Sequence, residues 1–129
     1  MPFLTPLRVE KVLFKDIWIL LKEFVYHHAP TEFCSLDVTI TVPVGFWTDF
    51  ASFPIVPLAV AQEAATIHDF LYRCDSDPLV DKDTADRIFF DALCESGVSI
   101  HHAAVMFDAV HLGGTSSYHK KYVKDKIGD

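Results

Sequence analysis

Ile67-His68-Asp69-Phe70-Leu71-Tyr72-Arg73 and, after a short loop, Ala85-Asp86-Arg87-Ile88-Phe89-Phe90 are the two stretches that decide the fold. At helical spacing, each presents one mostly apolar face to the core, and that face carries His68 in the first and Asp86 in the second. A buried carboxylate is costly unless it meets a partner. We therefore expect a hydrogen bond between His68 and Asp86 that joins two packed helices.

Length and composition indicate one domain over residues 1–129. Half of the residues are hydrophobic and 11 are Phe, so a core forms without disulfides or structural metals. A formal net charge of −7 argues against nucleic-acid binding, which needs a basic surface. No apolar run reaches the roughly 18 residues of a transmembrane segment.

The three cysteines show no CxxC spacing, and we find no secretory signal pattern. We therefore expect reduced thiols in a protein made in a cytosol. A disulfide between Cys74 and Cys94 is allowed by the spacing of their helices but is not required.

Periodicity divides the chain into a β half and an α half. Alternation and β-branched residues predict strands, at 7–14, 18–27 and 36–42, before an aromatic-rich loop at 46–54. Helical spacing, an N-cap at Asp81 and a closing Gly97 predict helices, at 58–73, 82–95, 99–112 and, shorter, 116–126. The expected fold class is α+β, a small N-terminal antiparallel sheet followed by three to four packed helices.

The predicted His68–Asp86 pair suits proton transfer, because a carboxylate fixes the tautomer of a histidine whose other nitrogen then accepts a proton. Tyr72, one turn after His68, is placed to donate to Asp86. Asp69 projects about 100° away from His68 and is suited to bind a hard cation. Two other interpretations stay open: Arg73 forms a helix salt bridge with Asp69, and the whole network only fixes helix packing.

Other polar residues are weaker candidates. Asp49, among aromatic neighbours, is a second metal ligand, a second carboxylate that orients the site, or part of an Asx turn, and Ser52 is expected to cap a turn. Asp108 is expected to be exposed. None of the remaining histidines has the His-x₃-His spacing of a zinc-binding helix. We expect most of them to lie on the surface, or in the core with their hydrogen bonds satisfied: His27, His28, His101, His102 and His111.

Two resemblances follow from these motifs. The first covers roughly residues 36–114, through Thr48-Asp-Phe-Ala-Ser-Phe-Pro54, His68-Asp-Phe-Leu-Tyr72 and Ala85-Asp86. These motifs resemble a family of uncharacterised tailed-phage and prophage proteins known as a domain of unknown function. The resemblance implies a virion protein of the tail or baseplate, made in the host cytoplasm, whose partners are other tail and baseplate proteins. Residues 36–129 would be the family core and residues 1–35 attachment strands or an arm.

The second resemblance is shorter. His68-Asp69-x-x-Tyr72 on one helix, with Asp86 on the next, is similar to the catalytic core of phospholipase A2 enzymes. It implies a two-helix core in which His68 is the general base, Asp86 its orienting carboxylate, Asp69 a calcium ligand and Tyr72 a support. The chain departs from that family by lacking its glycine-rich calcium loop and its disulfides, and Asp49 stands near the loop instead.

Two functions are therefore weighed. The first is a metal-assisted hydrolase of cell-envelope material, lipid or peptidoglycan, with calcium as the first choice of divalent cation and zinc as the second. The second is a non-enzymatic structural or adaptor protein of the tail or baseplate, in which the His–Asp–Tyr network is only structural. His68→Ala separates them, since it abolishes an activity in the first case and only destabilises the protein in the second.

Overall fold

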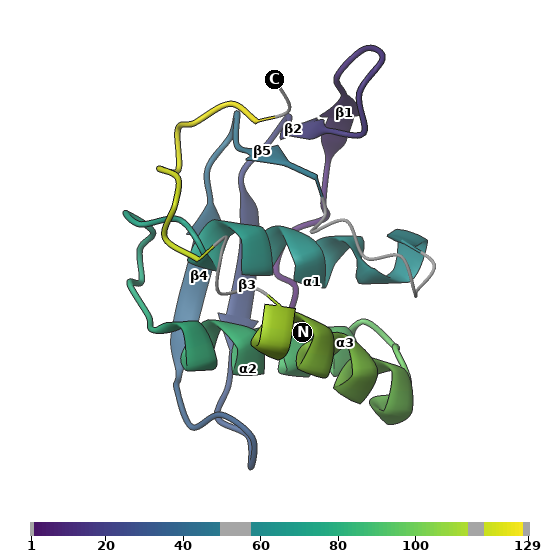
Figure 1. The fold of residues 1–129 in the computed structure, drawn as a ribbon, viewed down its shortest axis with the longest axis vertical. Helices are drawn as coiled ribbons and strands as arrows, with labels where there is room; N and C mark the ends of the chain where they lie inside the picture. Colours follow the sequence, from purple (N-terminus) through teal and green to yellow (C-terminus); the bar gives the residue numbers. More distant parts are fainter. Residues whose placement is uncertain (1, 50–57, 114–117, 128–129) are drawn as a thin grey trace.

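The structure is a computed structural model that describes residues 2–49, 58–113 and 118–127 (Figure 1). It confirms the α+β class, with antiparallel strands first and helices after them. Its elements, in chain order, are β1 (Val9–Lys11), β2 (Trp18–Leu20), β3 (Phe24–His28), β4 (Val38–Val42), β5 (Trp47–Thr48), α1 (Leu58–Leu71), α2 (Lys82–Glu95) and α3 (Ile100–Gly113).

The strands form two small antiparallel sheets rather than one. β1, β2 and β5 pair in that order, and β3 pairs with β4 so that Tyr26 lies opposite Ile40. The single strand predicted over 18–27 is therefore two strands, interrupted at residues 21–23, and β5 lies in the segment predicted to be a loop. The predicted alternation holds in β4, where Ile40 and Val42 are buried and Thr39 and Thr41 are exposed.

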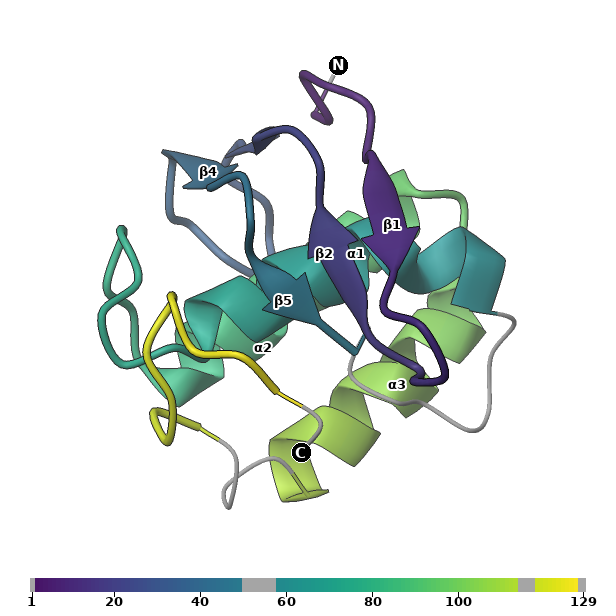
Figure 2. The same cartoon turned by 90° about the horizontal axis from the view of Figure 1, so that it is seen from above.

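The helices lie on one side of the β3-β4 sheet. α1 and α2 pack together and contact β4 and β3, whereas α3 packs on α2 (Figure 1). Seen from above, the β1-β2-β5 sheet lies over α1 (Figure 2). The largest side chains of the core come from both layers and include Phe24, Tyr26, Phe46, Ile67 and Phe89.

The predicted caps of α2 are confirmed, whereas α1 ends at Leu71, two residues before its predicted end. Asp81 accepts a hydrogen bond from the Thr84 amide at 2.8 Å and so caps α2. Gly97 follows α2 with a φ of 94°, a left-handed conformation that favours glycine. The Ser99 hydroxyl accepts from the His102 amide at 3.3 Å at the start of α3.

The short helix predicted over 116–126 is wrong for residues 118–126, which form turns and irregular backbone. Instead, backbone groups of this segment form hydrogen bonds with the backbone of residues 72–74, which follow α1. The His119 amide donates to the Tyr72 carbonyl at 2.7 Å, and the Cys74 amide donates to the Lys121 carbonyl at 2.8 Å. Long-range pairing has therefore replaced a helix that sequence propensity alone favoured.

Two further expectations concern the cysteines and the membrane. Cys34, Cys74 and Cys94 are all free, so the allowed Cys74–Cys94 disulfide is not formed. In the described ranges no helix has the length and apolar character needed to cross a bilayer.

Residues 1–35 take part in both sheets. Phe24 and Tyr26 of β3 belong to the core, and Phe3 stacks on Phe24 with ring centroids 6.0 Å apart. An attachment role for residues 1–35 stays a prediction. Among the described residues 2–35, the most exposed large apolar side chains are Leu13 and Phe14, in the turn between β1 and β2.

Candidate functional site

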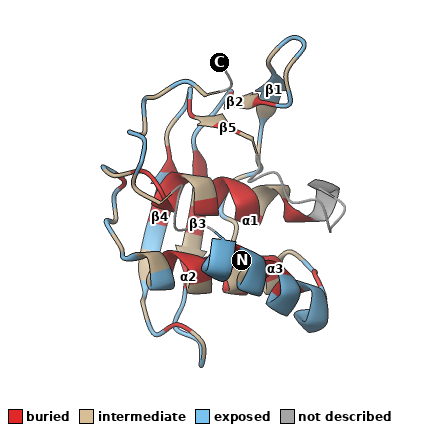
Figure 3. Cartoon of the chain, viewed as in Figure 1, coloured by how far each residue is buried: buried red, intermediate tan, exposed pale blue. Residues whose placement is uncertain are grey.

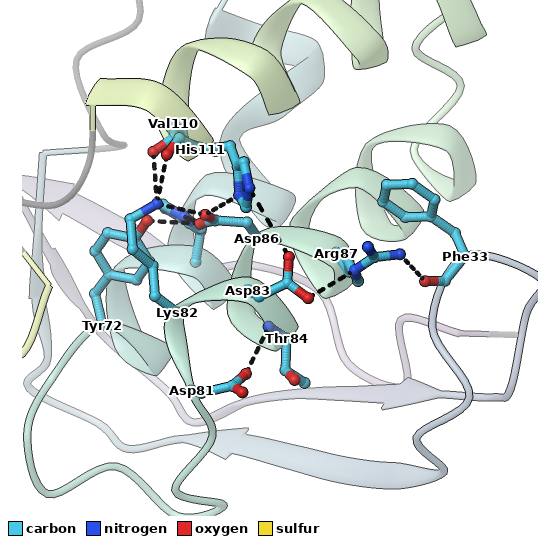
Figure 4. Close-up of polar contacts among 11 residues, drawn as sticks. Phe33, Tyr72, Asp81, Lys82, Asp83, Thr84, Asp86, Arg87, Val110 and His111 are labelled. Atoms are coloured by element: carbon cyan, nitrogen blue, oxygen red, sulfur yellow. Dashed lines mark hydrogen bonds and ion pairs between the residues drawn. The ribbon is translucent and has the colours of Figure 1, made fainter.

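Asp86 is the centre of a buried polar site where three helices meet. The last turn of α1 supplies His68, and Tyr72 follows directly after that helix. The first turns of α2 supply Lys82 and Asp86, and the last turn of α3 supplies His111. Figure 4 shows Tyr72, Lys82 and His111 converging on the Asp86 carboxylate.

Each oxygen of Asp86 accepts two hydrogen bonds. Oδ1 lies 2.9 Å from His68 Nε2 and 2.6 Å from the Tyr72 hydroxyl. Oδ2 lies 2.8 Å from Lys82 Nζ and 3.2 Å from His111 Nδ1. Burial alone would raise the pKa of Asp86, but the hydrogen bonds from His68, Lys82 and Tyr72 outweigh it and lower that pKa to about 2. Asp86 is therefore ionised at neutral pH.

The tautomer of His68 follows from the charge of Asp86. An ionised carboxylate only accepts hydrogen bonds, so His68 Nε2 carries the proton. Burial lowers the pKa of His68 more than its hydrogen bond to Asp86 raises it, so the ring is neutral. Nδ1 then holds a lone pair, and within the described part of the chain this buried atom has no hydrogen-bond partner. The predicted His68–Asp86 pair and its Tyr72 support are thus present, with one nitrogen available to accept a proton.

The ring of His68 is enclosed by aromatic side chains. Its centroid lies 4.0 Å from the Tyr72 ring and 4.7 Å from the Phe89 ring, and only 3% of the residue is exposed. An apolar enclosure strengthens electrostatic interactions and keeps the imidazole uncharged.

Asp69 faces a different neighbourhood, beside β5. Its carboxylate accepts a hydrogen bond from the buried Thr48 hydroxyl at 2.6 Å. Burial and then the nearby charge of Asp49 raise the pKa of Asp69 to about 7, even though the Thr48 hydrogen bond opposes that shift. The two carboxyl groups that the sequence singled out as metal ligands are therefore neighbours.

The salt bridge considered between Asp69 and Arg73 is not formed. Arg73 is buried, donates to the Trp47 carbonyl at 3.1 Å, and lies over the Phe46 ring at 5.1 Å. Its charge still lowers the pKa of Asp69, but less than burial and Asp49 raise it. Arg73 thus anchors the segment before Asp49 and does not neutralise Asp69 through a direct ion pair.

The oxygen atoms of Asp49 and Asp69 are of the type that binds a hard cation. Asp49 and Asp69 offer carboxylate oxygens, which calcium prefers, but calcium takes about six to eight oxygen ligands. Among the described residues, no group of three or more His, Cys, Asp or Glu side chains is arranged to hold a metal. Ser52, singled out in the same loop, lies outside the described residues.

The structure also contains a second buried His–Asp pair that the sequence analysis did not predict. His28 Nε2 lies 2.7 Å from Asp91 Oδ2, which also accepts from the Thr31 hydroxyl at 2.8 Å. His28 Nδ1 donates to the Leu36 carbonyl at 2.5 Å. Both ring nitrogens are therefore engaged, and His28 is a satisfied core histidine, as expected for most of the remaining histidines. The signal was present in β3, where period-two alternation buries His28 with Phe24 and Tyr26.

Lys82 and His111 are the functional candidates that the sequence analysis missed. Lys82 precedes Asp86 by four residues on α2, a spacing that favours an ion pair and could have identified it. His111 contacts Asp86 only because α3 returns across α2, and no local pattern encodes that contact. Asp108 is exposed, as expected.

These features define an α+β protein with an oriented, buried histidine at a three-helix junction. The chain belongs to the family described as protein of unknown function (DUF1353), which matches residues 18–110. This confirms the expectation of a domain-of-unknown-function family, and the match begins at β2 and includes both His–Asp pairs. Comparison with curated proteins and with solved structures gave no match.

Proposed function

We propose that this chain is a hydrolase of cell-envelope material, lipid or peptidoglycan, which a tailed phage carries in its tail or baseplate. One observation carries the hydrolase part: Nδ1 of neutral His68 has a buried lone pair without a partner in the described ranges, while Nε2 is held by Asp86. An unpaired buried acceptor is costly, and such groups concentrate at functional sites. The phage part is supported by the resemblance of the motifs around Asp49, His68 and Asp86.

In this proposal His68 is the general base. Nδ1 takes a proton from a water molecule as the water oxygen bonds to the carbonyl or phosphoryl centre of the substrate, and the ring becomes an imidazolium. The imidazolium then gives the proton to the leaving alcohol or amine as the ester, amide or phosphoester bond breaks. Asp86 stabilises that charge through Nε2–H and, with its pKa near 2, does not take the proton itself. Tyr72 and Lys82 each donate to Asp86 and hold it in place.

Asp69 and Asp49 are the proposed cation ligands, with calcium before zinc. A cation bound there would polarise a carbonyl or phosphoryl oxygen of the substrate. The raised pKa of Asp69 supports the proposal, because two neighbouring carboxylates repel each other until a positive charge or a proton lies between them. Calorimetric titration of the wild type with calcium, zinc and magnesium, compared with Asp69→Asn, tests this part. Heat that disappears in the variant supports it, and no heat in a folded wild type overturns it.

The chain offers a matched control for the catalytic histidine. His28 also forms a buried pair with an aspartate, but neither of its nitrogens is available. We expect His68→Gln to lower the hydrolysis of phospholipid vesicles or peptidoglycan by at least about a hundredfold. We expect His28→Gln to lower stability while the folded fraction keeps its activity. Equal activity of the two variants would contradict the role of His68.

A second candidate is a structural or adaptor protein of the tail or baseplate. It is favoured by the near-complete burial of His68, which is 3% exposed, and by the way Asp86 joins α1, α2 and α3. Under this candidate the wild type hydrolyses nothing, and both histidine variants only lower the free energy of unfolding. Mass spectrometry of purified phage particles tests the virion location common to both candidates.

A further inference from the structure

The outer face of α3 carries large apolar side chains although it is exposed. Only Ala103, Met106 and Val110 of this 14-residue helix are buried. Ile100 is 63% exposed, Val105 46% and Leu112 82%. Figure 3 shows most of α3 in the colour of exposed residues. A helix packed on one side normally presents charged and polar residues on the other.

His102, His111 and Gly113 are also exposed, but seven of the exposed residues form a regular stripe along the helix. They lie in two rows at spacings of four residues, and we call them the α3 stripe: Ile100, Ala104, Asp108 and Leu112 in one row, His101, Val105 and Ala109 in the other. Such rows are the ridges that pack into the grooves of another helix. Ala104 and Ala109 leave room for a second helix to approach closely.

The polar residues of the α3 stripe are self-complementary. Consider a two-fold axis that crosses the helix between Ala104 and Val105. It brings His101 opposite Asp108 of a second copy and, by symmetry, Asp108 opposite His101 of that copy. The same operation brings Ala104 opposite Val105 at the centre. An isologous interface needs this reciprocity, in which each residue meets the partner of its own partner.

We propose that α3 is a homodimer interface in which two copies of this chain pack antiparallel along the α3 stripe. The occupant is a second copy because the stripe places an imidazole and a carboxylate symmetrically about its own apolar centre. One helix from each copy buries less than the roughly 800 Å² per partner of a standard interface, so the dimer is weak and depends on concentration. The proposal does not rest on the proposed hydrolase function, because the stripe faces away from Met106 and Val110, the face that packs on the helical layer.

Sedimentation equilibrium over a wide concentration range tests the dimer. We expect the mean mass of the wild type to rise from one chain mass towards two. Val105→Glu places two like charges at the centre, so we expect that variant to stay monomeric. Val105 is exposed, and circular dichroism checks that the variant keeps the wild-type fold. Leu13→Glu, at an exposed apolar residue outside the stripe, is the matched control and should associate like the wild type.

A charge exchange tests the antiparallel register. His101→Glu and Asp108→Arg should each weaken association at least tenfold, because each leaves like or unpaired charges facing each other. The double variant places a carboxylate opposite a guanidinium and should associate at least as tightly as the wild type. A wild type that is monomeric at all concentrations, or a Val105→Glu variant that still dimerises, would overturn the proposal. So would association lost in Leu13→Glu, or a double variant weaker than both single variants.

Discussion

His111 Nδ1 lies 3.2 Å from Asp86 Oδ2, so the end of α3 is tied to the carboxylate that orients His68. Lys82 strengthens the same connection. Its ammonium donates to Asp86 and to the carbonyls of Val110 and His111, which end α3. A cation at a helix C-terminus satisfies the last carbonyls and interacts favourably with the helix dipole. The orientation of His68 therefore depends on three helices rather than two.

Removing the Asp86 carboxylate should destabilise the whole junction. The Asp86→Ala substitution removes the hydrogen-bond acceptor of three side chains, those of His68, Tyr72 and Lys82. It also removes the negative charge that is paired with the Lys82 ammonium. Breaking a buried pair by removing one partner costs about 3–5 kcal/mol. We expect a loss of that size in the free energy of unfolding measured by urea titration.

The control for this prediction is Asp83→Ala. Asp83 pairs with Arg87 one turn away, but its side chain is 51% exposed. Exposed pairs of this kind contribute about 0–1 kcal/mol. Similar losses for the Asp83 and Asp86 variants would show that the junction does not stabilise the fold.

The uncharged state of His68 predicts a specific pH dependence. Burial lowers the pKa of His68 below its usual 6.5, so as the pH falls through 6.5 the unfolded chain takes up the proton first. The contribution of His68 to stability is therefore present above pH 6.5 and decreases on acidification. We expect the difference in unfolding free energy between wild type and His68→Gln to shrink from pH 8 to pH 5. A ring resonance that titrates at or above 6.5 by NMR would contradict a neutral His68.

His28 should show the opposite sign. Burial opposes its charge, but the hydrogen bond to Asp91, the Leu36 carbonyl and the charge of Glu95 together raise the pKa of His28 above 6.5. A raised histidine pKa stabilises the fold fully below pH 6.5, and that stabilisation is lost as the pH rises through the folded-state value. The stability difference between wild type and His28→Gln should therefore shrink from pH 6 to pH 9. A constant difference over that range would mean that His28 is neutral.

The sequence predicted the centre of the site because the pattern is local. His68, Tyr72 and Asp86 lie within two adjacent helices, and the cost of burying Asp86 indicated which residue it meets. The alternation of β4 and the caps at Asp81 and Gly97 were likewise read from short stretches. Such features need only the period of a helix or strand and the chemistry of its ends.

What the sequence did not reveal depends on long-range contacts. His111 reaches Asp86 because of how α3 packs, and Asp91 meets His28 across 63 positions of sequence. Residues 118–127 pair with the chain after α1 rather than forming a helix. The break in the strand predicted over 18–27 has the same origin, since β2 and β3 join different sheets. In each case tertiary partners outweigh local propensity.

Asp69→Asn should stabilise the protein at neutral and alkaline pH. The pKa of Asp69 rises from 3.8 to about 7 in the folded state, so between those values the folded protein binds the extra proton and stability declines as the pH rises. Asparagine keeps an acceptor for the Thr48 hydroxyl and removes the repulsion from Asp49. Because Asp69 is partly exposed, solvent screening reduces the gain, and we expect about 1–2 kcal/mol above pH 7 and almost none below pH 4. Thermal unfolding of both proteins from pH 4 to pH 8 measures this difference. If added calcium stabilises the wild type and not the variant, Asp69 is a cation ligand. A variant less stable than the wild type at pH 8 would instead show that the Asp69 carboxylate is stabilised where it lies.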